Sequence, residues 1–163
     1  MRIVDGWVDI DDVDSFLDEL GSIANHHGSV VQAFDARYVA GEAHLEAAVD
    51  RANRAFDHDD TIADDRAIEI LCYAAGRRQI ERAMALGVKA GRCPVAAVID
   101  GGAEDDAAGD LQERIDSDAV LGVARDDDLI MDFFNITEPE RSATDVGLEA
   151  LVIERVSLLA VDK

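Results

Sequence analysis

The sequence predicts an α/β (α+β) fold, with one domain over residues 1–163 in which several helices pack on a small mixed or antiparallel sheet. Two observations lead to this prediction. The chain is long enough to bury one sizeable core, and 48% of its residues are apolar, which is typical of a folded protein. Segments with the periodicity of strands also alternate along the chain with segments of helical periodicity. The order of the strands stays open.

The first part of the chain predicts two strands and two helices. Residues 2–10 alternate apolar and polar side chains and predict a strand. Residues 11–28 begin with aspartates that can cap a helix, carry apolar residues at helical spacing and end at Gly28, so they predict a helix. Residues 29–34 (SVVQAF) predict a second strand, and residues 41–56 predict a helix with one apolar side.

The middle of the chain predicts two helices separated by a glycine, followed by a buried strand. Residues 64–75 follow the i, i+3, i+4, i+7 rule, and Gly76 interrupts them. Residues 77–86 resume the helical spacing, with Gly87 as a C-cap. Residues 93–100 (CPVAAVID) form a continuous apolar run behind a proline, which predicts a buried strand.

The last third of the chain is less regular. Residues 101–110 predict a loop, which leads into a weak helix near residues 111–115. Residues 119–124 (AVLGVA) are a candidate strand. Residues 126–136 predict a helix with an acidic first turn that suits the helix dipole. Residues 143 to about 160 predict the last helix.

The chain is strongly acidic, with 36 Asp and Glu against 15 Lys and Arg and a net charge of −21. This imbalance argues against indiscriminate binding to nucleic acid or to anionic membranes. Asp is preferred over Glu and Lys is scarce, as on the surface of a salt-accumulating halophilic archaeon. The Debye length falls to about 3 Å in molar salt, so the self-repulsion would be screened there. Most of the carboxylates therefore indicate habitat and not function.

The remaining composition indicates a cytoplasmic protein. Cys72 and Cys93 stand among apolar residues without a CxxC pair or zinc-ligand spacing, so both are expected to be buried free thiols. Asp5 and Asp9 interrupt the apolar core that a signal peptide needs. No apolar run approaches the ~20 residues of a membrane span, and we expect no membrane partner.

One short stretch departs from the acidic character. Between positions 66 and 92 only Glu69 and Glu81 are acidic, whereas six residues are basic: Arg66, Arg77, Arg78, Arg82, Lys89 and Arg92. A helix that starts after Gly76 would expose free N–H groups beside these arginines, which is the chemistry of an anion site. The alternative is that the arginines are solvated or paired with neighbouring carboxylates.

The same stretch resembles a known family signature. EILCYAAGRRQIERAMALGVKAG, from Glu69 to Gly91, is similar to the signature of the small subunit of the KEOPS tRNA-modification complex, the PRPK-binding protein (TPRKB) family. The matching residues are Glu69, Ile70, Leu71, Gly76, Arg78, Gln79, Ile80, Ala83 and Gly87. The match covers some 25 residues, and elsewhere only the order of the elements fits. Ala75 and Arg77 stand where serine and glutamine are common in the family.

The resemblance implies a subunit without catalysis of its own. KEOPS installs the threonylcarbamoyl group on the adenosine beside the anticodon, and the chemistry belongs to its transferase subunit. The small subunit binds the kinase-like ATPase subunit, reaches the transferase through it and holds the single-stranded 3′ CCA end of tRNA. Such an end offers bases for stacking and phosphates for arginines.

From this resemblance we expect the tRNA end to contact Arg78, Gln79 and Arg82, with Arg77, Lys89 and Arg92 nearby. The arginines would clamp phosphates and stack on bases, and Gln79 could donate a hydrogen bond to a base or a 2′-hydroxyl. For Gln79, a helix-capping or inter-helix hydrogen bond is the alternative.

The predicted last helix carries more apolar surface than one docking face needs. Its apolar positions span roughly 240° of the helix, against the ~100° that packs a surface helix on its own core. Either the chain itself buries the helix on both sides, or a partner covers one side. The resemblance names the kinase-like subunit as that partner. Val152, Val156 and Leu159 share a face and are the candidate contacts.

No catalytic set is visible. The sequence has no Gly-rich phosphate loop, no GxSxG motif and no Cys/His arrangement with a base. We therefore expect no enzymatic activity, no catalytic or metal-binding residues and no cofactor. Two alternatives stay open. One is a protein-only adaptor that regulates the kinase-like subunit through the last helix without contacting RNA. The other is a small hydrolase that uses carboxylates and histidines, with or without a metal.

Overall fold

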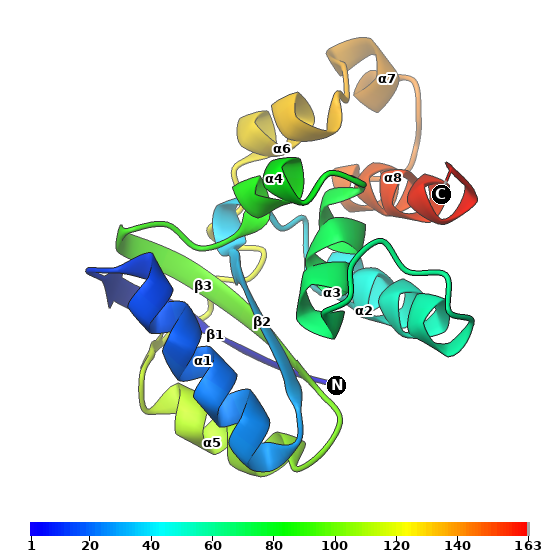
Figure 1. Cartoon of the computed structure of the whole chain (residues 1–163). Helices are drawn as coiled ribbons and strands as arrows, with labels where there is room; N and C mark the ends of the chain where they lie inside the picture. The colour runs from blue at the N-terminus through cyan, green and yellow to red at the C-terminus, as the bar shows by residue number, and fades with distance from the viewer. Residues whose placement is uncertain (163) are drawn as a thin grey trace. The chain divides into compact units, whose positions relative to one another are not determined.

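The computed structural model describes residues 1–162, and contacts within the chain group them into two compact units (Figure 1). We call Met1–Ala36 and Gly87–Ala124 the sheet unit. We call Arg37–Leu86 and the described part of Arg125–Lys163 the helical unit. The predicted α+β class is confirmed, and the sheet is antiparallel. The assignment of residues 1–163 to one domain stays a prediction.

The sheet unit contains a four-stranded sheet of order β2-β3-β1-β4, in which every pair is antiparallel. Its strands are β1 (Arg2–Ile10), β2 (Val30–Asp35), β3 (Gly91–Asp100) and β4 (Asp116–Ser117). In β3 the side chains from Val95 to Ile99 are all fully buried, so the continuous apolar run was a sound indicator of a buried strand.

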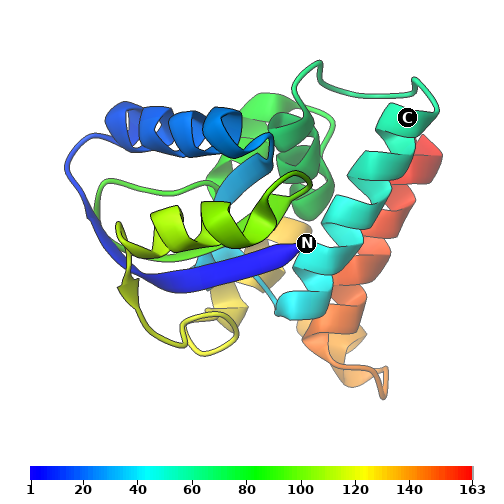
Figure 2. The ribbon, with the colours of Figure 1, turned by 90° about the horizontal axis from the view of Figure 1, so that it is seen from below.

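Two helices, α1 (Val13–His27) and α5 (Glu104–Gln112), lie side by side over one face of this sheet (Figure 2). Apolar side chains from both helices and from that face of the strands form one core. The predicted caps of α1 are confirmed, because the Asp12 carboxylate accepts from the Asp14 N–H and Gly28 adopts the left-handed conformation.

The helical unit is built on α2 (Glu42–Asp57), α3 (Arg66–Ala75) and α8 (Leu148–Asp162), which pack against one another. Shorter segments complete it: the 3₁₀ turn η1 (Ala36–Tyr38, whose first residue belongs to the sheet unit), α4 (Ile80–Ala83), η2 (Met84–Leu86), α6 (Asp127–Phe134) and α7 (Glu138–Ser142). No helix in the described chain is both long and apolar enough to cross a lipid bilayer.

Buried polar side chains order the helical unit. The fully buried Glu69 carboxylate accepts from the Ala63 N–H at 2.7 Å and from the Ile62 N–H at 2.9 Å, which holds the segment before α3. The His44 ring accepts from the Ala40 N–H at 3.1 Å and donates through Nε2 to the Ala74 carbonyl at 2.7 Å. These two bonds fix the tautomer of His44, and burial lowers its pKa from 6.5 to about 4.

Three predictions for the last third of the chain were wrong. Residues 101–110 are not a loop, because α5 begins at Glu104, where its acidic first turn suits the helix dipole. Residues 119–124 form a turn instead of a strand, since the Asp5 carboxylate takes the N–H groups of Val120 and Leu121 at 3.0 and 2.9 Å. The predicted helix from residue 143 starts only at Leu148.

Candidate functional site

The basic stretch begins in a turn and not in a helix. Gly76 ends α3 with a φ of +61°, and the Arg77 N–H donates to the Cys72 carbonyl at 3.1 Å. Helix α4 starts at Ile80 and has four residues, so Arg77 and Arg78 precede it. The predicted helix over residues 77–86 is therefore wrong at its start. The argument from free N–H groups and a helix dipole fails with it, since so short a helix has little dipole.

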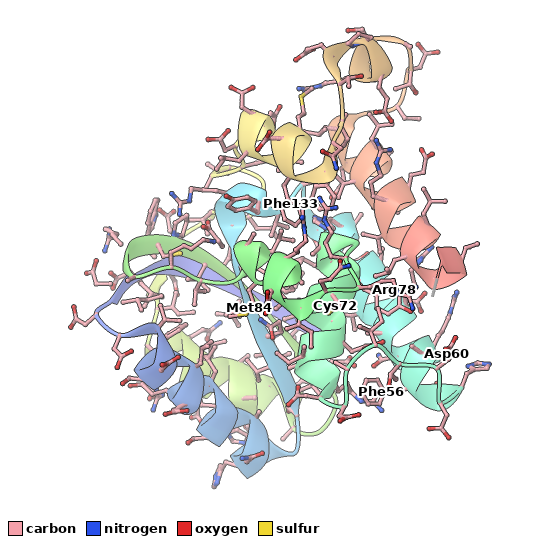
Figure 3. The ribbon with its side chains drawn as sticks, turned by 45° about the horizontal axis from the view of Figure 1, so that its top comes forward. Phe56, Asp60, Cys72, Arg78, Met84 and Phe133 are labelled. Atoms are coloured by element: carbon pink, nitrogen blue, oxygen red, sulfur yellow. The ribbon has the colours of Figure 1, made fainter. Side chains whose placement is uncertain are left out.

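The side chains of this turn nevertheless form an exposed surface. Arg78, Gln79 and Arg82 are exposed, and Arg82 has no carboxylate partner among the side chains of residues 1–161. Ile80 and Met84 lie on the same stretch with exposed fractions of 40% and 58%. Figure 3 shows Arg78 and Met84 on the segment that follows α3. Gln79 occupies the N-cap position of α4 but makes no capping hydrogen bond with its side chain. The surface thus combines guanidinium groups with apolar contact area.

Arg77 differs from its neighbours because it is anchored inside the helical unit. Its guanidinium lies over the Phe133 ring, 4.7 Å from the centroid, and Nη2 donates to the Phe133 carbonyl. Burial and then the charge of Arg82 lower the pKa of Arg77. Its Nε is buried without a hydrogen-bond partner. The side chain therefore links the turn to the end of α6, while its charge stays close to that of Arg82.

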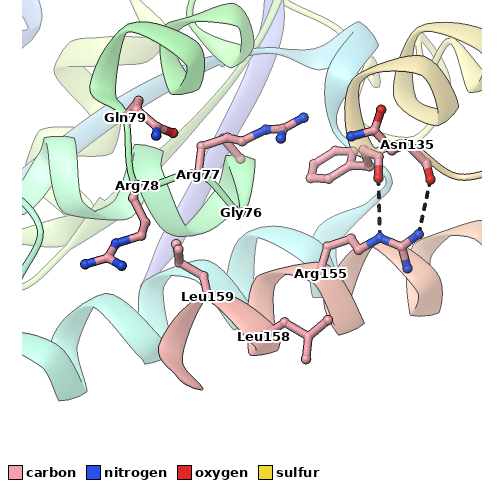
Figure 4. A pocket seen from close by; sticks show the side chains of 10 residues that line it. Gly76, Arg77, Arg78, Gln79, Asn135, Arg155, Leu158 and Leu159 are labelled. Atoms are coloured by element: carbon pink, nitrogen blue, oxygen red, sulfur yellow. Dashed lines mark hydrogen bonds between the residues drawn. The ribbon is translucent and has the colours of Figure 1, made fainter. Parts of the chain in front are cut away.

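A cavity of about 370 Å³ opens beside this turn (Figure 4), and we call it the first pocket. Its lining residues are Ala75, Gly76, Arg77, Arg78, Gln79, Phe134, Asn135, Arg155, Leu158 and Leu159. Three guanidinium groups thus border one cavity of the helical unit, and apolar side chains of α6 and α8 complete its wall.

Arg155 was not among the predicted site residues. Its Nε donates to the Phe134 carbonyl and its Nη2 to the Asn135 carbonyl, both at 3.3 Å (Figure 4). Nη2 also pairs with Glu140 at 2.9 Å, and this contact raises the pKa of Arg155. The sequence offered one signal for it, namely a single arginine within the apolar arc of the last helix.

Two predicted contact residues lie in the sheet unit and are paired there. Lys89 Nζ lies 3.3 Å from the Asp35 carboxylate, which is fully buried, and donates to the Gly87 carbonyl at 2.7 Å. Arg92 pairs with Asp9 at 3.2 Å and with Asp116 at 3.6 Å. Of the six predicted residues, the structure therefore brings together Arg77, Arg78, Gln79 and Arg82 in one unit.

The face of the last helix that the sequence suggested for partner contact is buried. Val152 and Val156 are fully buried and Leu159 is 5% exposed, so the prediction that these side chains face outward is wrong. They point into the interior of the helical unit, whose core needs them. The exposed apolar residues of α8 are on its opposite side and include Leu158 at 47% and Val161 at 78%.

The family signature divides into residues that the fold explains and residues that it does not. The Glu69 carboxylate accepts a hydrogen bond from the backbone before α3, and Ile70 and Leu71 lie in the core. Gly76 forms the left-handed C-cap of α3. For the Gln79 side chain the described residues offer no such structural role. Within residues 1–162, no group of three or more His, Cys, Asp or Glu side chains is placed to hold a metal ion.

Comparison with known families gives one match. The chain matches the family model described as kinase binding protein CGI-121 over residues 9–160. It belongs to the CGI-121 family of kinase-binding proteins. The resemblance noted in the basic stretch is thereby extended to nearly the whole chain, and a kinase is the expected partner of a CGI-121 protein. No curated protein matches the chain.

Proposed function

We propose that this CGI-121 protein is a KEOPS subunit without catalysis of its own, which binds the kinase-like ATPase subunit and holds the 3′ CCA end of tRNA. The observation that carries the tRNA part is the first pocket, where Arg77, Arg78 and Arg155 border a cavity of about 370 Å³ in a chain of net charge −21. In this role the subunit supports threonylcarbamoylation of the adenosine next to the anticodon.

The chemistry of the surface suits a single-stranded end better than a duplex. Arginine donors hold phosphates, and guanidinium planes and apolar side chains such as Ile80 and Met84 offer contact to unstacked bases. A cavity of this size lies at the low end of the range for small-ligand sites, about 300–1,000 Å³. The terminal nucleotide of a free strand can enter such a cavity, whereas a base pair inside a helix cannot.

The experiment compares an intact tRNA with the same tRNA that lacks its CCA end, by fluorescence anisotropy at low and at molar salt. We expect weak binding of the intact tRNA and affinity lower by about tenfold, or 1.4 kcal/mol, for the shortened one. Arg78→Glu should reduce the affinity for intact tRNA to that of the shortened tRNA. Arg2→Glu, at an exposed arginine of the sheet unit, is the matched control. Equal binding of both tRNAs would instead support the protein-only adaptor.

For the kinase-like subunit we propose the exposed side of α8 as the docking face. Val161 and Ala150 lie on this side, opposite the buried Val152 and Val156. Exposed apolar area on a helix is a common protein contact, and the family is one of kinase-binding proteins. This face replaces the buried face that the sequence had suggested.

Val161→Glu tests this face, with Val123→Glu as its control. The two valines are almost equally exposed, at 78% and 77%, but Val123 lies in the sheet unit. We expect Val161→Glu to weaken binding to the purified kinase-like subunit by about tenfold or more in calorimetry, because a charge would be buried in the interface. Equal affinities of the two variants would remove α8 as the docking face and leave the tRNA proposal untouched.

A further inference from the structure

A second cation-lined cavity lies in the helical unit, and neither the family signature nor the basic stretch points to it. It has a volume of about 340 Å³ and is lined by Arg51, Arg54, Ala55, His58, Asp60, Tyr73, Ser157 and Ala160. We call it the second pocket. Arg51, Arg54 and His58 follow one another at spacings of three and four residues, so they lie on one face of α2 and its end.

Arg51 is the least expected member of this set. Its Nη2 donates to the Ser157 hydroxyl at 2.7 Å, which fixes the half-buried guanidinium at the wall of the pocket. No carboxylate of residues 1–161 pairs with it, although acids outnumber bases by 36 to 15 in the chain. Arg54 is exposed and pairs with Asp50 at 3.1 Å. Asp60 already has an interaction within the chain. Of the two arginines of the pocket, Arg54 therefore has a carboxylate partner and Arg51 has a hydroxyl partner only.

The two pockets share helix α8. Ser157 and Ala160 line the second pocket, while Leu158 and Leu159 line the first. At 100° per residue, Ser157 and Ala160 lie on one side of α8 and Leu158 and Leu159 on the other, so the pockets flank the same turns of α8. Their separation is therefore close to the width of one helix, about 10–12 Å. An extended strand covers such a distance within a few nucleotides.

We propose that the second pocket is a phosphate subsite for the same RNA strand whose 3′ end occupies the first pocket. It would receive a phosphodiester group 5′ to the terminal nucleotides, held by Arg51 and Arg54. This inference rests on the proposed function and adds a second contact point to it. Leu158, which lines the first pocket, would lie beneath the nucleotides nearest the 3′ end.

The test uses two RNAs in the same anisotropy assay. One is the short strand, the trinucleotide CCA without a 5′ phosphate, which lacks the proposed phosphodiester. The other is an acceptor-stem hairpin with the same CCA end. We expect the double variant Arg51→Gln/Arg54→Gln to bind the hairpin about tenfold more weakly, with a salt slope smaller by about two. Its affinity for the short strand should stay within about twofold of wild type. Arg78→Glu should weaken the binding of both RNAs.

Controls separate this subsite from general effects of charge and folding. Arg2→Gln/Arg114→Gln removes the same charge from the sheet unit and should leave both affinities unchanged. Arg51→Lys keeps the charge and should retain most of the hairpin affinity, which excludes a mere loss of structure. Thermal unfolding of each variant provides the folding check.

Two outcomes overturn the subsite. In the first, the double variant binds the hairpin as wild type does while Arg78→Glu still weakens it, so the proposed function stands and the second pocket is not part of it. In the second, the double variant loses affinity for the kinase-like subunit and not for RNA, which makes the pocket a protein contact. If neither Arg78→Glu nor the double variant changes RNA binding, the proposed function itself fails.

Discussion

The sheet unit and the helical unit neutralise their cations in different ways. Each Lys and Arg of the sheet unit has a carboxylate partner: Arg2 pairs with Asp105, Lys89 with Asp35, Arg92 with Asp9 and Arg114 with Glu19. In the helical unit, Arg51, Arg77 and Arg82 have no carboxylate partner among the side chains of residues 1–161, although that unit is also acidic.

The difference helps to locate function. Because carboxylates are so abundant in this chain, we expect most arginines to form an ion pair within it. An arginine without such a pair therefore needs a structural or functional explanation. Arg77 has one, because it stacks on Phe133, and Arg66 likewise lies over Phe56 and donates to Asn53. Arg51 and Arg82 have no comparable partner among the described side chains. Arg51 lines the second pocket, and Arg82 lies in α4, directly after the turn that follows α3. Unpaired cations, and not cations as such, therefore indicate where an external anion would bind.

The two units also treat histidine differently, and acid should reveal this with the largest effect. The buried His44 has a pKa of about 4 when folded and 6.5 in its ordinary state, so the unfolded chain takes up a proton first as the pH falls. Its contribution to stability is complete above pH 6.5 and is lost between pH 6.5 and 4. The loss should amount to about 3 kcal/mol in the free energy of unfolding.

Denaturant titrations at pH 7, 5.5 and 4.5 measure this loss, and hydrogen exchange locates it. We expect amides of α2 and α3 to lose protection first. His44→Gln should flatten the pH dependence in this window. An unchanged slope in His44→Gln would remove His44 as the cause.

Removing a paired cation should cost more stability than removing an unpaired one. Lys89→Met removes a cation that lies beside the fully buried Asp35, and we expect a loss of about 2 kcal/mol in the free energy of unfolding. Arg82→Met removes an exposed charge and should cost at most about 0.5 kcal/mol. Equal losses in urea titrations would contradict the comparison. The double variant Asp35→Asn/Lys89→Met should recover part of the first loss.

Left-handed glycines allow a further comparison of the units. Gly28 and Gly76 have nearly the same φ, +63° and +61°. A Cβ at Gly76 would lie 3.3 Å from the carbonyl oxygen of Arg155, whereas a Cβ at Gly28 would meet no atom within 4 Å. Gly28→Ala should cost about 1 kcal/mol for the backbone alone. Gly76→Ala should cost about 1 kcal/mol more, because the end of α3 and α8 must separate. Thermal unfolding of the pair measures the difference, and identical costs would mean that α8 adjusts freely.

Much of the fold was predictable from local pattern. Residues 2–10, 13–27 and 66–75 carry clear periodicity and caps, and the structure has the corresponding elements there. The misses have tertiary causes. The Asp5 carboxylate captures the backbone of Val120 and Leu121, and no local pattern reveals a bond over 115 residues. Helix α5 relies on small alanines, whose periodicity is weak as a hydrophobic signal.

The candidate site was predictable in part, for the same reason. A linear count of charges found Arg78 and Arg82, but it could not separate them from Lys89 and Arg92, whose partners are distant in sequence. The pairing of Arg92 with Asp9, for example, requires the antiparallel register of β1 and β3. Burial of Val152 could not be foreseen either, since an apolar arc does not say which side another helix covers.

The smallest expected effect is the most direct test of the comparison. Arg82→Gln and Arg92→Gln remove one positive charge each from exposed arginines, one unpaired in the helical unit and one paired with Asp9 and Asp116 in the sheet unit. We expect Arg82→Gln to lower the affinity for tRNA by about threefold and the salt slope by about one, because one phosphate contact is lost. Arg92→Gln should change neither quantity.

The two variants are measured at several salt concentrations. They have the same net charge, so a general effect of charge on tRNA binding would act equally on both. Only the difference between them reports a local contact. If Arg92→Gln lowers tRNA affinity and its salt slope as much as Arg82→Gln does, then an internal ion pair does not keep an arginine from RNA. In that case the contrast between paired and unpaired cations loses its functional meaning, while the stability differences between Lys89→Met and Arg82→Met would remain.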